Sequence, residues 1–223
     1  MKDPNNRRIG IVAIMGSVRP GNYTSKALAL VANEIQQHDD IALEIIDPAT
    51  LKLLPPGISG DETDAKKVRG SVSKATGVIF ATPEYHGSFS SITKLVIENL
   101  GFPSVLSGKP VALLGVAAGQ IGAIKSLEAL GSVCAHVGAI VLPGPVSVAK
   151  VREVFDSEGR CLDSVVEKQI RSVATNLIDY IRGNICPRVA LESGISLRKS
   201  PGGAEGVSLR GFLRFRTAHR CTL

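Results

Sequence analysis

Short apolar runs alternate along the chain with longer segments in which apolar residues recur at helical spacing. The apolar runs predict strands at 8–15, 41–47, 76–85, 109–119 and 138–144. The segments between and after them predict helices at 24–38, 61–75, 90–101, 121–137 and 163–183. The last helix is expected to stop at Gly183. Five strands alternating with five helices predict a parallel sheet with helices on both faces.

The composition favours the same architecture. Apolar residues make up 44% of the 223 positions, but aromatic residues only 4%, and Trp is absent. A core built from Val, Ile, Leu and Ala is typical of a sheet that is buried on both faces. No apolar run approaches the roughly 20 residues of a membrane helix. The polar start "MKDPNNRR" and the short run after it do not resemble a signal peptide. We therefore expect a cytoplasmic protein with no membrane association.

Cysteine and histidine residues are scattered. The four cysteines include no Cys-x-x-Cys pair, and no two of the four histidines have the spacing of helical metal ligands. We therefore expect no metal site.

The positive charge is concentrated at one end of the chain. Residues 184–223 contain seven basic and two acidic residues, a net charge of +5, whereas 1–183 contain 19 basic and 18 acidic residues, a net charge of +1. The segment is rich in Gly, Ser and Arg and has no sustained period. We expect a domain at 1–183 followed by a mobile basic C-terminal extension at 184–223. Such a tail could touch nucleic acid, but a solvated extension is the simpler interpretation.

The stretch "AIMGSVRPGNYTSKAL" at 13–28 joins the first strand to the first helix through a small polar loop. Ligands of open parallel sheets bind beyond the carboxyl ends of the strands. A helix N-terminus there favours an anion, because its first N–H groups lack partners. Arg19 adds a cationic fork that suits phosphate. Short polar side chains complete the expected phosphate site: Ser17, Asn22, Thr24 and Ser25.

Other loops with similar roles fit less well. A P-loop would need Gly-Lys-Ser/Thr, and a dinucleotide-binding loop would need G-x-G-x-x-G, whereas Gly16 and Gly21 have neither spacing. A receiver domain would need an acidic cluster, and a small tyrosine phosphatase would need a cysteine in this loop. An ordinary strand-to-helix turn with a capping Ser or Thr remains open.

Two further loops follow the third and fourth strands. In "TPEYHGSFS" at 82–90, Pro83 keeps Thr82 extended and Gly87 permits a sharp turn. Tyr85 and His86 are then expected beside the first loop. The small residues of "GVAAGQIGA" at 115–123 allow a close backbone approach. A flat ring that carries one phosphate would fit between the three loops, and FMN is such a molecule.

The three loops resemble those of a known family. "GSVRPGNYTSKAL", "PEYHGSFSSITKLVIENL" and "GVAAGQIGA" are similar to the flavin loops of NADPH-dependent FMN reductases, which include bacterial quinone, azo-dye and chromate reductases. The resemblance covers about residues 8–182. It implies a flavodoxin-like three-layer α/β sandwich with a five-stranded parallel sheet in the order 2-1-3-4-5. It also implies non-covalent FMN and assembly into homodimers or homotetramers.

The resemblance also implies roles for individual residues. The phosphate side would be formed by Ser17, Arg19, Asn22, Tyr23, Thr24 and Ser25. The isoalloxazine would be lined, largely through backbone groups, by Pro83, Glu84, Tyr85 and His86, with Gly119 on the other side. Glu84 has an alternative role as a helix cap, and Tyr85 has one as a packing residue. The chain departs from the family at His86, where Asn is frequent, at Leu100 or Gly101, where Trp is frequent, and at Ala117 and Ala118.

The activity implied is hydride transfer from NAD(P)H to bound FMN, and then to a small-molecule acceptor such as a quinone, free flavin, azo compound or metal oxyanion. The flavin would carry the chemistry, so no catalytic side chain is expected. One alternative is a non-enzymatic electron carrier of the same fold. Carriers tend to be strongly acidic, unlike residues 1–183. A second alternative is a binding module that has lost FMN and contacts nucleic acid through its tail.

Overall fold

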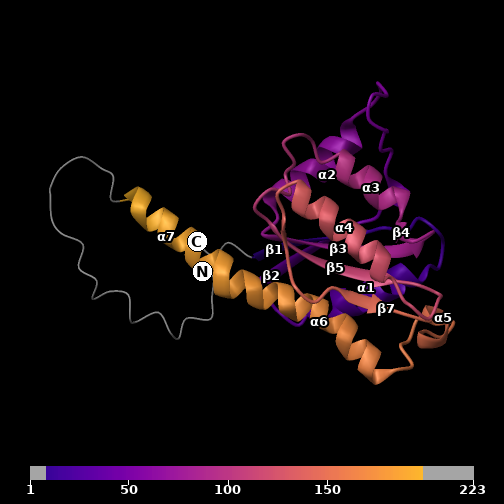
Figure 1. Ribbon diagram of the computed structural model, residues 1–223. Helices are drawn as coiled ribbons and strands as arrows, with labels where there is room; N and C mark the ends of the chain where they lie inside the picture. Colours follow the sequence, from indigo (N-terminus) through magenta and orange to yellow (C-terminus); the bar gives the residue numbers. More distant parts are fainter. Residues whose placement is uncertain (1–8, 198–223) are drawn as a thin grey trace.

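The computed structural model describes residues 9–197, and the side chains up to Leu191. Its centre is a parallel sheet in the order β2-β1-β3-β5-β6, which confirms the predicted topology. The bounds of these strands are Ile9–Met15 for β1, Ile41–Ile46 for β2, Gly77–Tyr85 for β3, Pro110–Val116 for β5 and Ile140–Val141 for β6. Figure 1 shows the sheet between two layers of helices.

The fifth strand differs from its prediction. A single strand was expected at 138–144, but the chain forms β6 and then β7 (Val146–Val148), and both pair with β5 in parallel. The residues between them are Leu-Pro-Gly-Pro at 142–145. Proline has no N–H for a strand ladder, so Pro143 and Pro145 interrupt the pairing.

Helices cover both faces of the sheet, as expected. Helices α1 (Tyr23–Ile35) and α6 (Ser164–Tyr180) pack on one face, and α2 (Thr63–Lys74), α3 (Ser91–Glu98) and α4 (Ile124–His136) pack on the other. Successive strand residues alternate between the two core clusters, so that Ile79 faces α1 and α6 while Phe80 faces the other three helices. This double burial explains why the central strands β1, β3 and β5 are largely apolar, whereas the edge strand β2 is partly exposed and contains Glu44.

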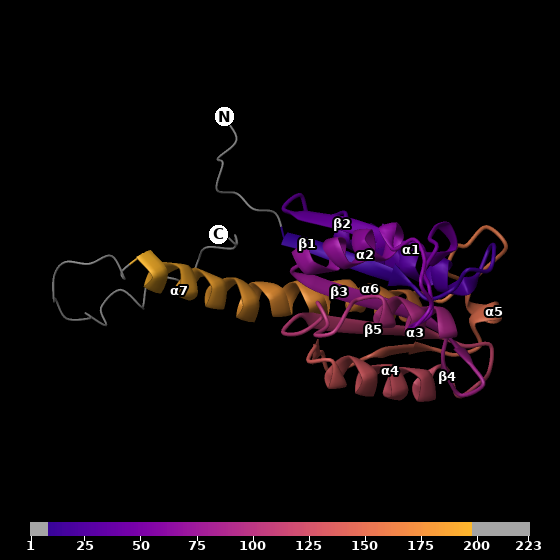
Figure 2. The ribbon, with the colours of Figure 1, turned by 90° about the horizontal axis from the view of Figure 1, so that it is seen from above.

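The expected helix end at Gly183 is wrong. The chain stays helical through a wider π turn, η2 (Ile181–Ile185), and then α7 (Cys186–Leu197), which extends away from the sheet in Figures 1 and 2. A glycine costs a helix only about 1 kcal/mol, which neighbouring turns can offset. The π turn ends two residues before Pro187, whose ring would crowd a carbonyl one regular turn earlier. Residues 184–197 of the expected extension are therefore helical, and 198–223 lie outside the described residues.

Three short elements were not predicted. Strand β4 (Ser88–Phe89) forms a hairpin with the end of β3, η1 (Pro48–Thr50) is a 3₁₀ turn, and α5 (Val151–Val154) is a single helical turn after β7. Figures 1 and 2 place β4 and α5 at the end of the molecule opposite α7. Within the described residues, no helix has both the length and the apolar composition required to cross a membrane.

Candidate functional site

The three predicted loops meet at the carboxyl ends of neighbouring strands. Strand β3 lies between β1 and β5, so the loops after Met15, Tyr85 and Val116 leave the sheet side by side. The chain proceeds from β1 to β2 on one side of β1 and to β3 on the other. Such a reversal of strand order opens a crevice at the strand ends, where doubly wound proteins bind ligands.

The first loop begins with a close backbone approach at Gly16. Its N–H donates to the Ala81 carbonyl at 2.7 Å. A Cβ at this position would lie 2.7 Å from the Ala81 oxygen and would also clash with the Thr93 hydroxyl. Glycine is therefore required here to bring the loop against the end of β3.

Ser17 is the most informative residue of the loop. Its side chain is only 3% exposed, and its hydroxyl has no hydrogen-bond partner within the described chain. A buried hydroxyl without a partner costs about 1–3 kcal/mol. Buried polar groups in folded proteins normally have partners, so this hydroxyl indicates a site for a polar ligand.

Arg19 joins the first loop to the loop after β3. Its guanidinium carbon lies 4.8 Å from the centre of the Tyr85 ring, in cation–π geometry. Arg19 is exposed and Tyr85 is half-buried. Tyr85 therefore lies beside the first loop, as expected. The guanidinium of Arg19 remains accessible to an anion.

Asn22 is the N-cap of α1. Its Oδ1 accepts from the Ser25 N–H at 2.7 Å, and its Nδ2 donates to the Arg19 carbonyl at 2.7 Å. The Ser25 hydroxyl donates to the Asn22 carbonyl at 2.7 Å. These side chains hold the loop and the first turn of the helix. For Asn22 and Ser25 the alternative of an ordinary capped turn therefore applies, although the cap is Asn and not Ser or Thr.

The other two residues of the helix start face the protein. Thr24 is buried, and the Tyr23 ring lies 6.4 Å from the Phe155 ring, measured between centroids. The Lys26 ammonium lies 5.0 Å from the centre of the Tyr23 ring and donates to the Asp156 carbonyl at 2.8 Å. Tyr23 therefore helps to hold α1 against the segment before α6.

Glu84 caps a neighbouring helix. Its Oε2 accepts from the Ser126 N–H at 3.3 Å, in the first turn of α4. The residue at the N-cap position of α4 is Ala123, whose side chain cannot accept a hydrogen bond. The alternative role of Glu84 as a helix cap is therefore present, and it uses one oxygen of the carboxylate.

The chain at the end of β3 turns back in a tight hairpin, and we call its residues 83–86 the ledge. Tyr85 pairs with Ser88, so His86 and Gly87 form a two-residue turn, with φ of 52° and 75°. Two positive φ values are the requirement of a type I′ turn, and histidine is among the residues enriched in this region. His86 is exposed at the tip, whereas Pro83 is buried in β3 and pairs with Val116 of β5.

Gly119 lies in the exposed loop after β5. Its carbonyl accepts from the Lys150 N–H at 3.0 Å, which ties this loop to the start of α5. No atom lies within 4 Å of the position that a Cβ would take. At Gly119 the loop is therefore an open backbone segment.

Sequence analysis missed a group of buried hydroxyls beneath these loops. Thr82, Ser90 and Thr93 are all at most 3% exposed and are linked to one another by hydrogen bonds. We call them the hydroxyl cluster. A sequence signal exists only for Ser90, which stands at the expected start of a helix, where serine is a preferred cap.

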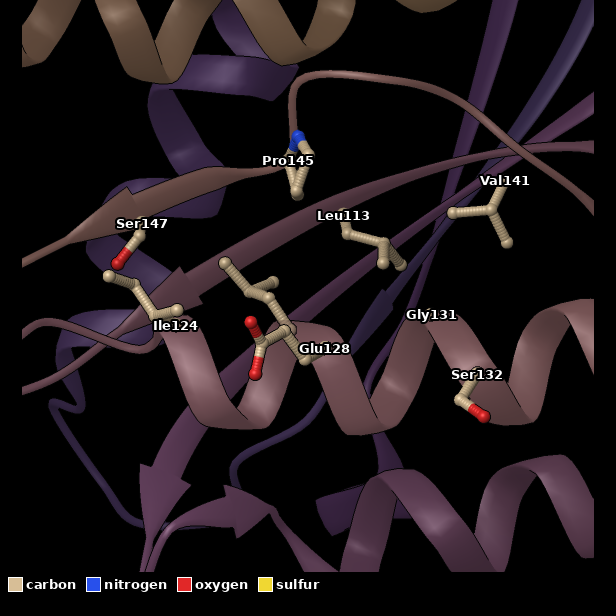
Figure 3. A pocket seen from close by; sticks show the side chains of 9 residues that line it. Leu113, Ile124, Glu128, Gly131, Ser132, Val141, Pro145 and Ser147 are labelled. Atoms are coloured by element: carbon tan, nitrogen blue, oxygen red, sulfur yellow. The ribbon is translucent and has the colours of Figure 1, made fainter.

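A cavity of about 310 Å³ lies elsewhere, beside α4 and the edge formed by β6 and β7 (Figure 3). Its walls are mainly apolar, including Leu113, Val141 and Pro145, and Glu128 is its charged residue. None of the predicted site residues lines it. A phosphate would meet an anion and no basic side chain there, so the cavity does not compete with the three loops.

Within the described residues, no group of three or more His, Cys, Asp or Glu side chains could hold a metal ion. The site consists instead of a helix N-terminus, a guanidinium, a buried hydroxyl and three backbone loops. The sheet order defines a flavodoxin-like α/β protein, and in such proteins the reversal of strand order, here between β1 and β3, is where ligands bind.

Comparison with known proteins identifies the family. The family profile of NADPH-dependent FMN reductases matches residues 9–153. The chain therefore belongs to this family of NAD(P)H-dependent flavin reductases.

Several characterised relatives are similar over most of the chain. The NAD(P)H-dependent FMN reductase PA1204 of Pseudomonas aeruginosa is 27% identical over 179 residues, which are 78% of this chain and 96% of the relative. A 2-hydroxy-1,4-benzoquinone reductase from Burkholderia sp. is 23% identical over 77% of this chain and 96% of its own length. An NADPH azoreductase from Bacillus sp. is 31% identical over 61% of this chain and 74% of its own.

Solved structures show the same fold. FerB, a flavoenzyme NAD(P)H:(acceptor) oxidoreductase from Paracoccus denitrificans, superposes with a TM-score of 0.66 at 19% identity, over 77% of this chain and 96% of that one. The apo form of the NADH:FMN oxidoreductase EMOB gives a TM-score of 0.65 at 21% identity, over 76% and 88% of the two chains.

Proposed function

We propose that the chain binds FMN in the crevice between β1 and β3 and uses it to pass hydride from NAD(P)H to a small-molecule acceptor. The observation that carries the proposal is the Ser17 hydroxyl, which is buried and has no partner within the described chain. It lies between the end of β1 and the N-terminus of α1, where an anion is favoured. Family membership supports FMN as the ligand.

The residues present fit the phosphate of FMN. The Ser17 hydroxyl can donate to a phosphate oxygen, and Arg19 can place its guanidinium opposite the negative charge. Asn22 keeps the first turn of α1 in shape, and Ser25 supports the Asn22 carbonyl. Nothing in the contacts of Tyr23 and Thr24 suggests a direct role, so we assign them to holding α1.

The residues after β3 and β5 fit the ring. We propose that the backbone of Pro83, Glu84, Tyr85 and His86 lines one edge of the isoalloxazine, and that the segment at Gly119 lines another. The type I′ turn fixes the peptide groups of this ledge. The α4 cap anchors Glu84, so the ledge is held from two sides.

Bound FMN would supply the hydride chemistry, accepting from a nicotinamide and donating to the second substrate. The contribution of the chain is to hold and orient the ring and to shield it from water. We assign no catalytic side chain.

Acceptor, assembly and location are further parts of the proposal. Relatives are named as FMN, benzoquinone and azo reductases, which supports a quinone, a free flavin or an azo compound as acceptor, and a metal oxyanion remains a candidate. We propose a homodimer or homotetramer, as expected from the family resemblance. The need for NAD(P)H supports a cytoplasmic location. We also propose 1–183 as the reductase domain, with 184–223 as its extension.

The test is the visible absorption spectrum of the purified full-length protein with added FMN, before and after anaerobic addition of NADPH. A perturbed flavin spectrum that bleaches with NADPH is expected. A flavin that binds but is not reduced by NADPH or NADH would contradict the reductase and favour the electron carrier. A protein that leaves the FMN spectrum unchanged would contradict the whole proposal.

A further inference from the structure

The hydroxyl cluster of Thr82, Ser90 and Thr93 lies between the first loop and the loop after β3. Thr82 belongs to β3, Ser90 is the N-cap of α3, and Thr93 is in the first turn of α3. Their exposed fractions are 0%, 3% and 0%. Three hydroxyls so deeply buried in one place must satisfy one another or a neighbouring backbone group.

The hydrogen bonds of the cluster determine where the Ser90 proton goes. Its Oγ lies 2.5 Å from the Gly16 carbonyl oxygen, which can only accept, so Ser90 is the donor. The same Oγ accepts from the Thr93 N–H at 3.1 Å and lies 2.9 Å from the Thr93 hydroxyl oxygen. Ser90 therefore donates its hydroxyl proton to the first loop, while its oxygen accepts from the Thr93 N–H.

Thr82 holds Ser90 from the other side. Its Oγ1 accepts from the Ser90 N–H at 3.2 Å and lies 3.3 Å from the Thr93 hydroxyl, which donates to it. Its own proton goes to the Pro83 carbonyl at 3.0 Å. The cluster thus fixes Ser90 relative to the start of the ledge that is proposed to line the isoalloxazine.

The bond from Ser90 to Gly16 also orients the next peptide group. The peptide between Gly16 and Ser17 is trans, and in a trans peptide the C=O and the N–H point in opposite directions. Because the Gly16 C=O is directed at Ser90 in the interior, the Ser17 N–H is directed away from Ser90. Backbone N–H groups presented by a loop before a helix are typical anion ligands.

A role limited to capping α3 would not need this contact. Ser90 caps α3 by accepting from the Thr93 N–H, which uses one lone pair of its oxygen. The hydroxyl proton of Ser90 is not needed for the cap. It is donated to the carbonyl of Gly16, 74 positions earlier in the sequence. Space for the contact exists because Gly16 has no Cβ, which would clash with Thr93.

We infer that Ser90 is a positioning residue for the phosphate of the flavin. It orients the Gly16–Ser17 peptide so that the N–H of Ser17, and with it the buried Ser17 hydroxyl, face the anion. Thr82 and Thr93 keep Ser90 in place. The inference rests on the proposed function, because it concerns the same site.

The experiment compares the affinity of the full-length protein for FMN and for riboflavin, which has the same ring but lacks the phosphate. Flavin fluorescence titration gives both dissociation constants. Their ratio, riboflavin over FMN, isolates the contribution of the phosphate. General damage to the fold weakens the binding of both ligands, whereas a misplaced phosphate loop weakens the binding of FMN alone.

The variants are Ser90→Ala, Ser90→Thr and Asp163→Ala. Ser90→Ala should lower the ratio about tenfold, because one hydrogen bond that orients the loop is lost. Ser90→Thr keeps the hydroxyl and should restore the ratio. Asp163 is the N-cap of α6, accepting from the N–H groups of Val165 and Val166 at 2.8 and 3.1 Å. Asp163→Ala therefore removes a cap whose hydrogen bonds do not involve the first loop or the hydroxyl cluster, and it should leave the ratio unchanged.

If Ser90→Ala does not fold, Ser90→Gly replaces it, since glycine is nearly as good a cap as serine. An unchanged ratio in the folded Ser90 variant, beside a wild type that prefers FMN, would overturn the inference and leave the proposed function intact. An equal loss of both affinities would also overturn it. A wild type that binds FMN no more tightly than riboflavin would contradict the phosphate site itself, and the inference with it.

Discussion

Ser17 is a residue at which the needs of folding and binding differ. Its buried hydroxyl lowers the stability of the ligand-free protein, because no group within the described chain satisfies it. Ser17→Ala should therefore raise the free energy of unfolding by up to about 1 kcal/mol and weaken FMN binding about tenfold. Urea unfolding of the ligand-free protein and flavin titration measure the two effects.

Ser126 provides the matched control. It is equally buried, but its hydroxyl donates to the Ala123 carbonyl at 3.1 Å. Ser126→Ala should lower the free energy of unfolding by about 1 kcal/mol. If Ser17→Ala is as destabilising as Ser126→Ala, the Ser17 hydroxyl has a partner in the protein and is not a vacant ligand contact.

Arg19 contributes a charge that can reach the phosphate. Arg19→Ala should weaken FMN binding by about 2 kcal/mol, about thirtyfold, because a charged hydrogen bond is lost. Riboflavin binding should change much less, apart from the lost contact with the Tyr85 ring. Arg152→Ala, at an exposed position on α5, makes the same change in net charge. Equal effects of the two substitutions on FMN would indicate long-range electrostatics instead of a phosphate contact.

At the scale of elements, the alternation of strands and helices was predictable because the central strands β1, β3 and β5 are buried on both faces. Apolar runs such as 76–85 and 109–119 therefore stood out along the chain. The missed elements β4, β7 and α5 contain two to four residues each, too few for a periodic pattern. The helix past Gly183 is not predictable from composition, because a glycine often ends a helix with a positive φ and Gly183 does not have one.

The loops of the site were predictable from their composition, but their support was not. Polar residues after a buried strand indicate a ligand loop, whereas Ser90 and Thr93 look like ordinary residues of a helix start. The partner of Ser90 is a carbonyl 74 positions away, and no local pattern reports such a contact. The capping role of Glu84 likewise depends on how α4 packs beside β3.

The cap supplied by Glu84 leads to a prediction about α4. A carboxylate at a helix N-terminus interacts favourably with the helix dipole, so Glu84→Gln should lower the free energy of unfolding by about 0.5–1 kcal/mol. Thermal or urea unfolding measures this loss. Glu128→Gln removes the same charge one turn later on α4 and should have a smaller effect. An equal effect of both substitutions would mean that the bond from Ser126 to Glu84 contributes little.

At the scale of the whole molecule, α7 lies outside the body that carries the site. Figures 1 and 2 show it extending from the end of the sheet opposite β4 and α5. A chain ending at Cys186 retains Ile185 and Cys186, which pack against the core. It should bind FMN as tightly as the full chain, measured by flavin titration. A large loss of affinity, or salt-sensitive DNA binding by the full chain that disappears on truncation, would contradict a dispensable extension.

The buried thiol of Cys134 should make the free energy of unfolding depend on pH in the alkaline range. Burial raises the pKa of this thiol from 9.0 to about 12. Below pH 8 the thiol is protonated in both folded and unfolded chains, so it adds no pH dependence. Between pH 9 and 12 the unfolded chain loses the proton while the folded chain keeps it. The free energy of unfolding should therefore fall by about 1.4 kcal/mol per pH unit from this group.

Cys134→Ala should remove that part of the slope, measured by urea unfolding at a series of pH values from 8 upward. The variant will also be less stable at pH 8, because a small cavity replaces the sulfur. The relevant comparison is therefore the slope against pH and not the absolute stability. Identical slopes for the variant and the wild type would show that the thiol ionises without unfolding the protein.

The interrupted fifth strand has a consequence for the behaviour of the protein in concentrated solution. An unbroken outer strand offers a row of free backbone groups that can recruit a strand from another molecule, which is a common start of aggregation. Here β6 and β7 contain two and three residues, and Pro143 and Pro145 lie between them. The sheet edge formed by β6 and β7 is too short, and has too few free N–H groups, to pair with a strand of a second molecule. Pairing of two copies through backbone groups at this edge of the sheet is therefore disfavoured, which leaves β2 (Ile41–Ile46), at the opposite edge, as the continuous outer strand of the described sheet.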